Sequence, residues 1–268
     1  MRPSFLKSFN LDVIVEMIEM ACRLEKWDKA IETSEILYEC VQCLYQEQQY
    51  RKAKSSPLLT IELEHPLVYY YGFSYLTRGM AYQEKREYGE ARAYIDKYAE
   101  LGWLEDLGED GLEVVEEFRF LAQVNGYALE LLSGGVGVLT SYTAFLRENP
   151  EEVLPGLDVI LQAALRYGLD VDELLIMFAE HTAEFSTYED EGNLEHFYRF
   201  THHLALYYKQ AGRMMEAMEQ IVQAVRLAYR SGNESHSTRS LALFESLRDW
   251  ATVEQVSEVQ ALIKGLIP

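Results

Sequence analysis

The chain has 268 residues, of which 49% are hydrophobic and 12% aromatic, so it can bury a sizeable core and is not expected to be disordered. Its 44 acidic residues against 24 basic ones give a formal net charge of −20, a field that repels phosphates and argues against direct nucleic-acid binding by this chain. Since no apolar run approaches the roughly 18 residues of a membrane helix and acidic residues interrupt the apolar N-terminal stretch, we expect a cytoplasmic protein with no membrane partner.

Helical periodicity recurs along the chain, and the alternating pattern of β-strands is nearly absent. The first two predicted helices cover 11–24 and 27–50, and the next helical run begins near Pro66, a residue suited to a helix start. Short loops are predicted at 51–57, 102–111, 186–193 and 230–237. Roughly a dozen helices joined by short connections predict an all-α fold.

The stretch GMAYQEKREYGEARAYIDKYAEL, residues 79–101, carries the spacing of a tetratricopeptide repeat. In this helix-turn-helix unit a glycine or alanine lies where the two helices touch, and aromatic residues fill the gaps around the contact. The matching residues are Tyr75, Gly79, Tyr82, Tyr88, Ala91 and Ile95. Arg78 stands where the pattern has leucine.

Two other segments repeat the pattern. The second match comprises Leu204, Ala205, Tyr208, Gly212, Ala217, Ile221 and Ala224, and a weaker third comprises Met17, Ala21, Trp27, Ala30 and Leu37. The alanines at 30, 91 and 217 are 61 and 126 residues apart, so the array must contain lengthened helices and divergent pairs. We therefore predict a tetratricopeptide-like superhelix, an α-solenoid with irregular repeats.

The predicted repeats form a single helical-repeat domain over 1–268. Its parts are a repeat-like helix pair at 11–50, the best repeat at 65–101, divergent helix pairs at 112–186, a further repeat at 194–231, and capping or dimerisation helices at 238–268. A terminal repeat must either shield its apolar face or share it, so a homodimer contact at the C-terminal helices is one possibility.

The segments EHPLVYYYGFSYLTRGMAYQEKREYGEARAYIDKYAELGWLEDL and ENPEEVLPGLDVILQAA resemble the repeat domain of transcription regulators from Gram-positive bacteria. Those proteins join a helix-turn-helix DNA-binding head to a tetratricopeptide superhelix, and many relatives sense short secreted peptides in quorum sensing. The resemblance covers roughly residues 11–230 and implies a sensing or protein-contacting part. No helix-turn-helix head precedes the repeats in this chain, so we expect a stand-alone repeat protein or a head that lies outside it.

Candidate ligand contacts follow from the repeat register, because the first helix of each pair lines the concave surface of a solenoid. The candidates are Phe73, Leu76, Met80 and Gln83 in one repeat, Arg199, His202, Leu206 and Lys209 in another, and Gln123 and Asn125 in a divergent pair. An Asn amide both donates to and accepts from a peptide backbone, and Arg199 and Lys209 are suited to hold a carboxylate. For each of these residues, packing or solvation is the competing interpretation.

Catalytic and metal chemistry find little support in the sequence. His196 and His203 are seven positions apart, whereas paired histidine ligands on a helix come closer together. Cys40 and Cys43 form a CxxC inside a helical pattern with no second CxxC, which favours two small apolar residues on one helix face. Since no nucleophile with an orienting base is recognisable, we expect no enzyme, no cofactor and no metal.

Three functional hypotheses remain. The first is a peptide-binding regulatory protein that closes around a short peptide or a segment of a partner protein, shifting a conformational equilibrium. The second is a constitutive protein-protein adaptor that homodimerises without a small ligand. The third is the effector half of a DNA-binding regulator whose basic head lies elsewhere.

Overall fold

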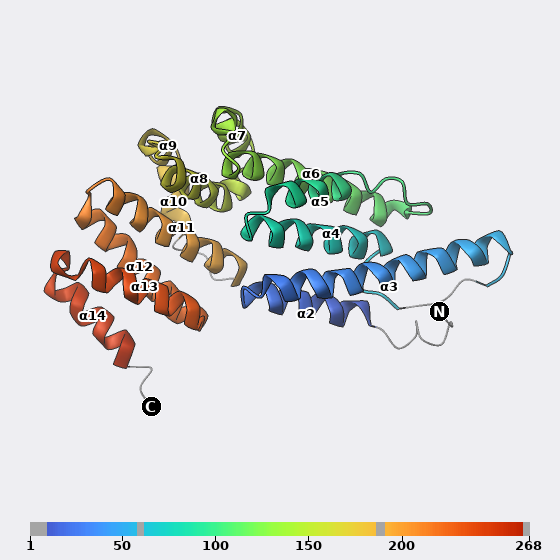
Figure 1. Ribbon diagram of the computed structural model, residues 1–268, viewed down its shortest axis with the longest axis horizontal. Helices are drawn as coiled ribbons and strands as arrows, with labels where there is room; N and C mark the ends of the chain where they lie inside the picture. The colour runs from blue at the N-terminus through green and yellow to red at the C-terminus, as the bar shows by residue number, and fades with distance from the viewer. Residues whose placement is uncertain (1–9, 58–61, 186–190, 265–268) are drawn as a thin grey trace. The chain divides into compact units, whose positions relative to one another are not determined.

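The computed structural model describes residues 10–57, 62–185 and 191–264, and the regular structure within these ranges is entirely helical. Thirteen α-helices and three short 3-10 helices are described there, so the all-α prediction is confirmed (Figure 1). The chain divides into two compact units, Met1–Leu129 and Glu130–Pro268, and each is described by itself. The predicted single repeat domain over the whole chain stays a prediction.

The first unit is built from long helices that pack on their neighbours in the sequence. They are α2 (Leu11–Arg23), α3 (Trp27–Ala53), α4 (Leu67–Glu84), α5 (Tyr88–Ala99) and α6 (Gly108–Leu132), the last of which runs past residue 129. Helix α2 packs on α3, α3 on α4, and α4 on α5. The helices predicted at 11–24 and 27–50 are present. The loop predicted at 102–111 was too long, because α6 already begins at Gly108.

The second unit consists of shorter helices around the pair α11 and α12. Its elements are η1 (Val136–Val138), α7 (Leu139–Glu148), η2 (Pro150–Glu152), α8 (Val153–Tyr167), α9 (Asp172–Met177), α10 (Ala179–Glu184), α11 (Glu191–Gln210), α12 (Met214–Ser231), α13 (Glu234–Ser246), η4 (Arg248–Trp250) and α14 (Val253–Lys264). Helix α11 packs on α8 and α12, and α12 packs on α13. Most of the loop predicted at 186–193 lies outside the described residues.

The connection predicted at 230–237 is much shorter in the structure. Helix α12 runs to Ser231 and α13 begins at Glu234. The Asn233 side chain caps α13 by accepting hydrogen bonds from the backbone amides of Ser235 at 3.0 Å and His236 at 3.2 Å. The polar residues of this stretch thus start a helix rather than form a loop.

One turn geometry recurs between α2 and α3, between α4 and α5, and between α11 and α12. A single residue in each turn has a left-handed φ: Glu25 at 53°, Arg86 at 63° and Gly212 at 77°. The next residue donates its backbone N–H to the carbonyl five positions earlier, with an N···O distance of 2.8 Å in all three turns. These bonds define a Schellman-type helix end.

A buried alanine follows each of these turns at the same place. Ala30, Ala91 and Ala217 are each the fourth residue of their helix and each is 0% exposed. Their burial agrees with the expectation that a small residue marks the closest contact within a helix pair. Three hairpins therefore share one local construction, although two of them have non-glycine residues at the left-handed position.

Helix α4 contains two buried glycines with different surroundings. A Cβ added to Gly79 would lie 3.5 Å from the Cβ of Tyr94 on α5, an ordinary contact. A Cβ added to Gly72 would overlap the ring of Phe118 on α6, which is itself buried. The repeat pattern identified Gly79, but Gly72 is the position that only glycine fits.

These surroundings predict opposite effects of the same substitution. We expect Gly79→Ala to stabilise the protein by up to about 1 kcal/mol, because alanine is the better helix former. Gly72→Ala gains the same propensity but must displace Phe118, and we expect a net loss of roughly 1–3 kcal/mol. Urea denaturation of both variants measures the difference; equal effects would contradict the close approach of α4 and α6.

Candidate functional site

The second unit has a groove of about 640 Å³ between α9, α10, α11 and α12. Its apolar floor is one face of α11, formed by Phe197, Phe200, Leu204 and Tyr208. These residues recur at steps of three and four, so they share one side of the helix. The two short helices α9 and α10 add the opposite wall, including the exposed side chain of Ile176.

Two cations at the rim of this groove are paired within the chain, and the exposed carboxylate of Glu219 also lines it. The Nη1 atom of Arg213 lies 3.1 Å from both carboxylate oxygens of Asp172, and its guanidinium carbon lies 4.2 Å from the ring centre of Tyr208. Arg226 donates through Nη2 to Glu258 at 2.7 Å. The groove therefore presents apolar surface, neutral hydrogen-bonding groups and one carboxylate, that of Glu219.

An amide is available in the groove for a ligand. Gln220 on α12 lines it, and the Gln220 side chain makes no hydrogen bond to any residue in the described part of the chain. Primary amides both donate and accept hydrogen bonds, as a peptide backbone does. An apolar floor with a neutral amide at its edge suits a segment of polypeptide.

The first unit has a smaller hollow of about 380 Å³, formed by the second half of α3, the start of α4 and residues 104–107. Lys52 is its basic side chain, and its Nζ atom donates to the two oxygens of Asp106 at 2.8 and 2.6 Å. Since this cation is neutralised within the chain, we regard the α9–α12 groove as the stronger candidate.

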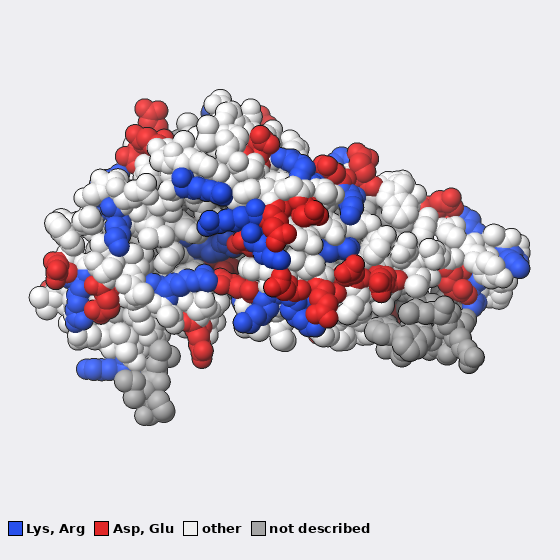
Figure 2. All heavy atoms as spheres, viewed as in Figure 1, with Lys and Arg blue, Asp and Glu red and all other residues white. Residues whose placement is uncertain are grey.

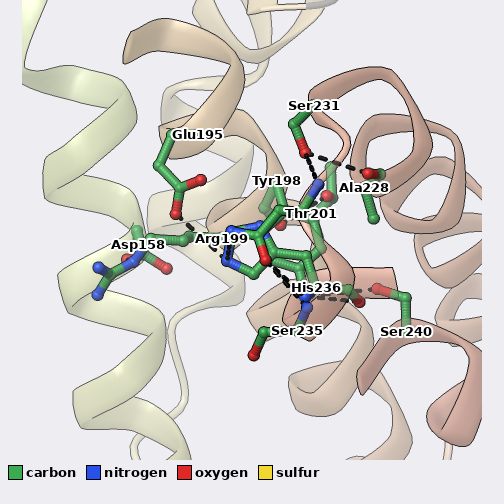
Figure 3. A network of polar contacts seen from close by, with 11 residues as sticks. Asp158, Glu195, Tyr198, Arg199, Thr201, Ala228, Ser231, Ser235, His236 and Ser240 are labelled. Atoms are coloured by element: carbon green, nitrogen blue, oxygen red, sulfur yellow. Dashed lines mark hydrogen bonds and ion pairs between the residues drawn. The ribbon is translucent and has the colours of Figure 1, made fainter. Parts of the chain in front are cut away.

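A buried carboxylate lies on another side of α11 (Figure 3). Asp158 of α8 is 3% exposed and accepts hydrogen bonds from Gln162 at 2.9 Å and from Nε of Arg199 at 3.3 Å. The Nδ1 atom of His203 lies 2.5 Å from its other oxygen. Burial alone would raise the pKa of Asp158, but the charges of His203 and Arg199 outweigh it and lower that pKa to about 2. The carboxylate thus stays ionised inside the unit.

Aromatic stacking continues this network towards α13. The ring of Tyr198 stacks on that of His236 with a centroid distance of 3.9 Å, and it also packs on His202 at 5.8 Å. Burial, together with the positive charge of neighbouring His203 and Arg239, lowers the pKa of His202 to about 4. Glu195 lies 3.5 Å from Nε2 of His236, and both residues are labelled in Figure 3. This network ties α8, α11 and α13 together and is best explained as structural.

The four α11 residues predicted to contact ligand do not line the groove. Arg199 and His202 belong to the polar network, Leu206 is half-buried, and Nζ of Lys209 donates to Ser246 on α13 at 3.0 Å. They are offset by one or two positions from the floor residues. The period of the floor residues was visible in the sequence, but the repeat register assigned that side of the helix to packing.

The other six predicted residues belong to the first unit. On α4, Phe73 stacks on Tyr69 at 5.7 Å, Leu76 and Gln83 are half-buried, and Met80 is exposed. On α6, Gln123 is exposed. Asn125 donates to the hydroxyl of Tyr98 at 3.0 Å. Their ligand contacts stay predictions, and for Phe73 and Asn125 the structure supplies a packing role.

Comparison with protein families, with curated proteins and with solved structures finds no match to this chain. Among the residues that the structure describes, no helix combines the length and hydropathy needed to cross a membrane. In the same ranges, no three His, Cys, Asp or Glu side chains converge as metal ligands would. On the face shown in Figure 2, basic side chains lie among acidic ones.

Proposed function

We propose that this chain is a regulatory protein that binds a short peptide or an extended segment of a partner protein in the α9–α12 groove. The single observation that carries the proposal is the composition of that groove: four apolar or aromatic side chains from one face of α11, bordered by an amide with no partner among the described residues and by two cations that are paired within the chain. Such a surface favours a polypeptide over a phosphorylated or strongly charged ligand.

The architecture we propose around the groove is a tetratricopeptide-like solenoid. Its support is the construction shared by three helix pairs, each with the same Schellman-type turn and a buried alanine five residues after the left-handed residue. The likeness of the sequence to the sensing part of bacterial transcription regulators makes regulation by ligand binding our preferred role, in the cytoplasm. A constitutive homodimeric adaptor is the alternative.

The test is selection of binders from a phage-displayed library of short random peptides on the purified chain. Enriched peptides are then measured against two matched pairs of variants. Ile176→Ser with Gln220→Ala alters the groove, whereas Leu206→Ala with Lys209→Ala alters the α11 side predicted from the sequence. We avoid Arg199→Ala and Asn125→Ala, because each removes a part-buried hydrogen bond, whereas the bond from Lys209 to Ser246 is exposed.

We expect the groove pair to weaken binding about tenfold or more and the other pair to leave it unchanged, since the few residues that anchor a ligand cost more than about 1 kcal/mol each when truncated and about 1.4 kcal/mol is tenfold in affinity. A loss of peptide binding only in the Leu206→Ala/Lys209→Ala variant would place the site on the side of α11 that was predicted from the sequence. Enrichment of no peptide at all, together with a concentration-dependent dimer in sedimentation, would favour the adaptor.

A further inference from the structure

Helix α2 has a second apolar face that no described part of the chain covers. Val13, Met17, Met20 and Leu24 are 47%, 51%, 58% and 61% exposed. They recur at steps of four, three and four, which puts them on one side of the helix, opposite the buried face that packs on α3. Scattered single apolar residues are normal on a protein surface, but a continuous stripe along one helix marks an interaction surface.

Carboxylates predominate in the part of the chain that carries this stripe. Residues 11–40, which comprise α2 and the first half of α3, contain eight acidic and three basic residues. Glu16 is exposed beside the stripe on α2. The first half of the neighbouring helix α3 exposes one large apolar side chain, Ile36, close in sequence to the exposed acids Glu32, Glu35 and Glu39. One of the three cations, Lys29, is bound to Glu32 at 2.9 Å.

We propose that this surface, the α2 stripe of Val13, Met17, Met20 and Leu24, docks an amphipathic helix of another protein whose apolar face is bordered by lysine and arginine. Two flexible methionines let the surface adapt to the shape of such a helix. Helices that lie on apolar surfaces use anchors at this spacing, and basic flanks would meet the acidic border. A second copy of this chain would instead bring the same carboxylates against each other, which opposes self-association through the stripe.

The test uses two synthetic helical peptides with the same apolar face, one of leucine and lysine and one of leucine and glutamate. The protein is labelled with ¹³C at its methionine methyl groups, so that Met17 and Met20 report on the stripe and Met80 and Met215 report on exposed surface elsewhere. The variant pair Met17→Gln/Met20→Gln removes the apolar anchors, and Met80→Gln/Met215→Gln is the matched control. All four positions are exposed, so the fold is expected to tolerate the changes.

We expect the lysine peptide to shift the Met17 and Met20 methyl signals, and the stripe variant to bind it at least tenfold more weakly while the control variant binds as before. Equal binding of both peptides would overturn the charge argument. Equal binding of the lysine peptide by both variants would show attraction by net charge alone and also overturn the proposal. A dimer of the free protein that the stripe variant loses would assign the surface to a second copy.

Discussion

Replacing Arg199 and His203 together by Met and Leu should lower the free energy of unfolding by roughly 3–5 kcal/mol, the range found when a buried ion pair loses one side. The two residues are the ion-pair partners of Asp158, a carboxylate that is 3% exposed. Without them the charge stays in an apolar interior with only the Gln162 amide among its described hydrogen-bond donors. Urea denaturation gives the loss, and Arg230→Met, at an exposed position of α12, is the matched control.

Adding Asp158→Asn to that double variant is expected to restore most of the lost stability, because no buried charge then needs a partner. The pH dependence separates this explanation from simple loss of packing. In the native protein the pKa of Asp158 is lowered to about 2, so its contribution is present above the unfolded value of 3.8 and is lost as pH falls.

In the double variant burial is the main remaining influence on that carboxyl, and its pKa should rise above the unfolded value. The cost of burying the unpaired charge is then present at pH 7 and is lost as the pH falls and the carboxyl is protonated. The difference in free energy of unfolding between the native protein and the double variant should therefore be smaller at pH 4.5 than at pH 7. The double variant lacks the His203 charge that helps to lower the pKa of His202, so the pH dependence is compared with the triple variant, which shares that loss. A gap that is independent of pH, or a triple variant as unstable as the double, would contradict the electrostatic explanation.

The sequence predicted the helices and the small residues at their contacts because both depend on local spacing. Period and turn residues place α2, α3, α4 and α5, and Ala30, Ala91 and Ala217 are all buried as the repeat pattern requires. Of the three turn residues with a left-handed φ, only Gly212 could be recognised from the sequence. At Glu25 and Arg86 nothing in the residue type marks a left-handed φ, which is set by the helices on either side.

The candidate groove and the buried polar network were less predictable because they depend on contacts between distant segments. Asp158 and Arg199 are 41 residues apart, and Asp158 and His203 are 45 apart. The sequence therefore presented Arg199 as a free cation. The groove depends likewise on how α9 and α10 lie against α11, which periodicity within one helix does not specify. Gly72 needs glycine only because Phe118 of α6 packs on it.

Arg78 shows how a departure from the repeat pattern is accommodated. It is 6% exposed, and its guanidinium carbon lies 4.8–5.3 Å from the ring centres of Tyr38, Tyr75 and Tyr94. Its Nε donates to the Ser74 carbonyl at 3.0 Å. In the described part of the chain no carboxylate pairs with it. Cation–π attraction from three faces thus takes the place of a counter-ion.

Restoring the leucine of the repeat pattern at this position tests what the cation contributes. Arg78→Ala should lower the free energy of unfolding by about 3 kcal/mol, because it leaves a cavity between three tyrosine rings. Arg78→Leu fills much of that space and removes a buried charge, so we expect a change within about 1 kcal/mol. Urea denaturation of the two variants compares them directly. If Arg78→Leu lowers the free energy of unfolding as much as Arg78→Ala does, the cation itself holds the tyrosine cluster together. The first unit then requires arginine at this position and does not merely tolerate it in place of leucine.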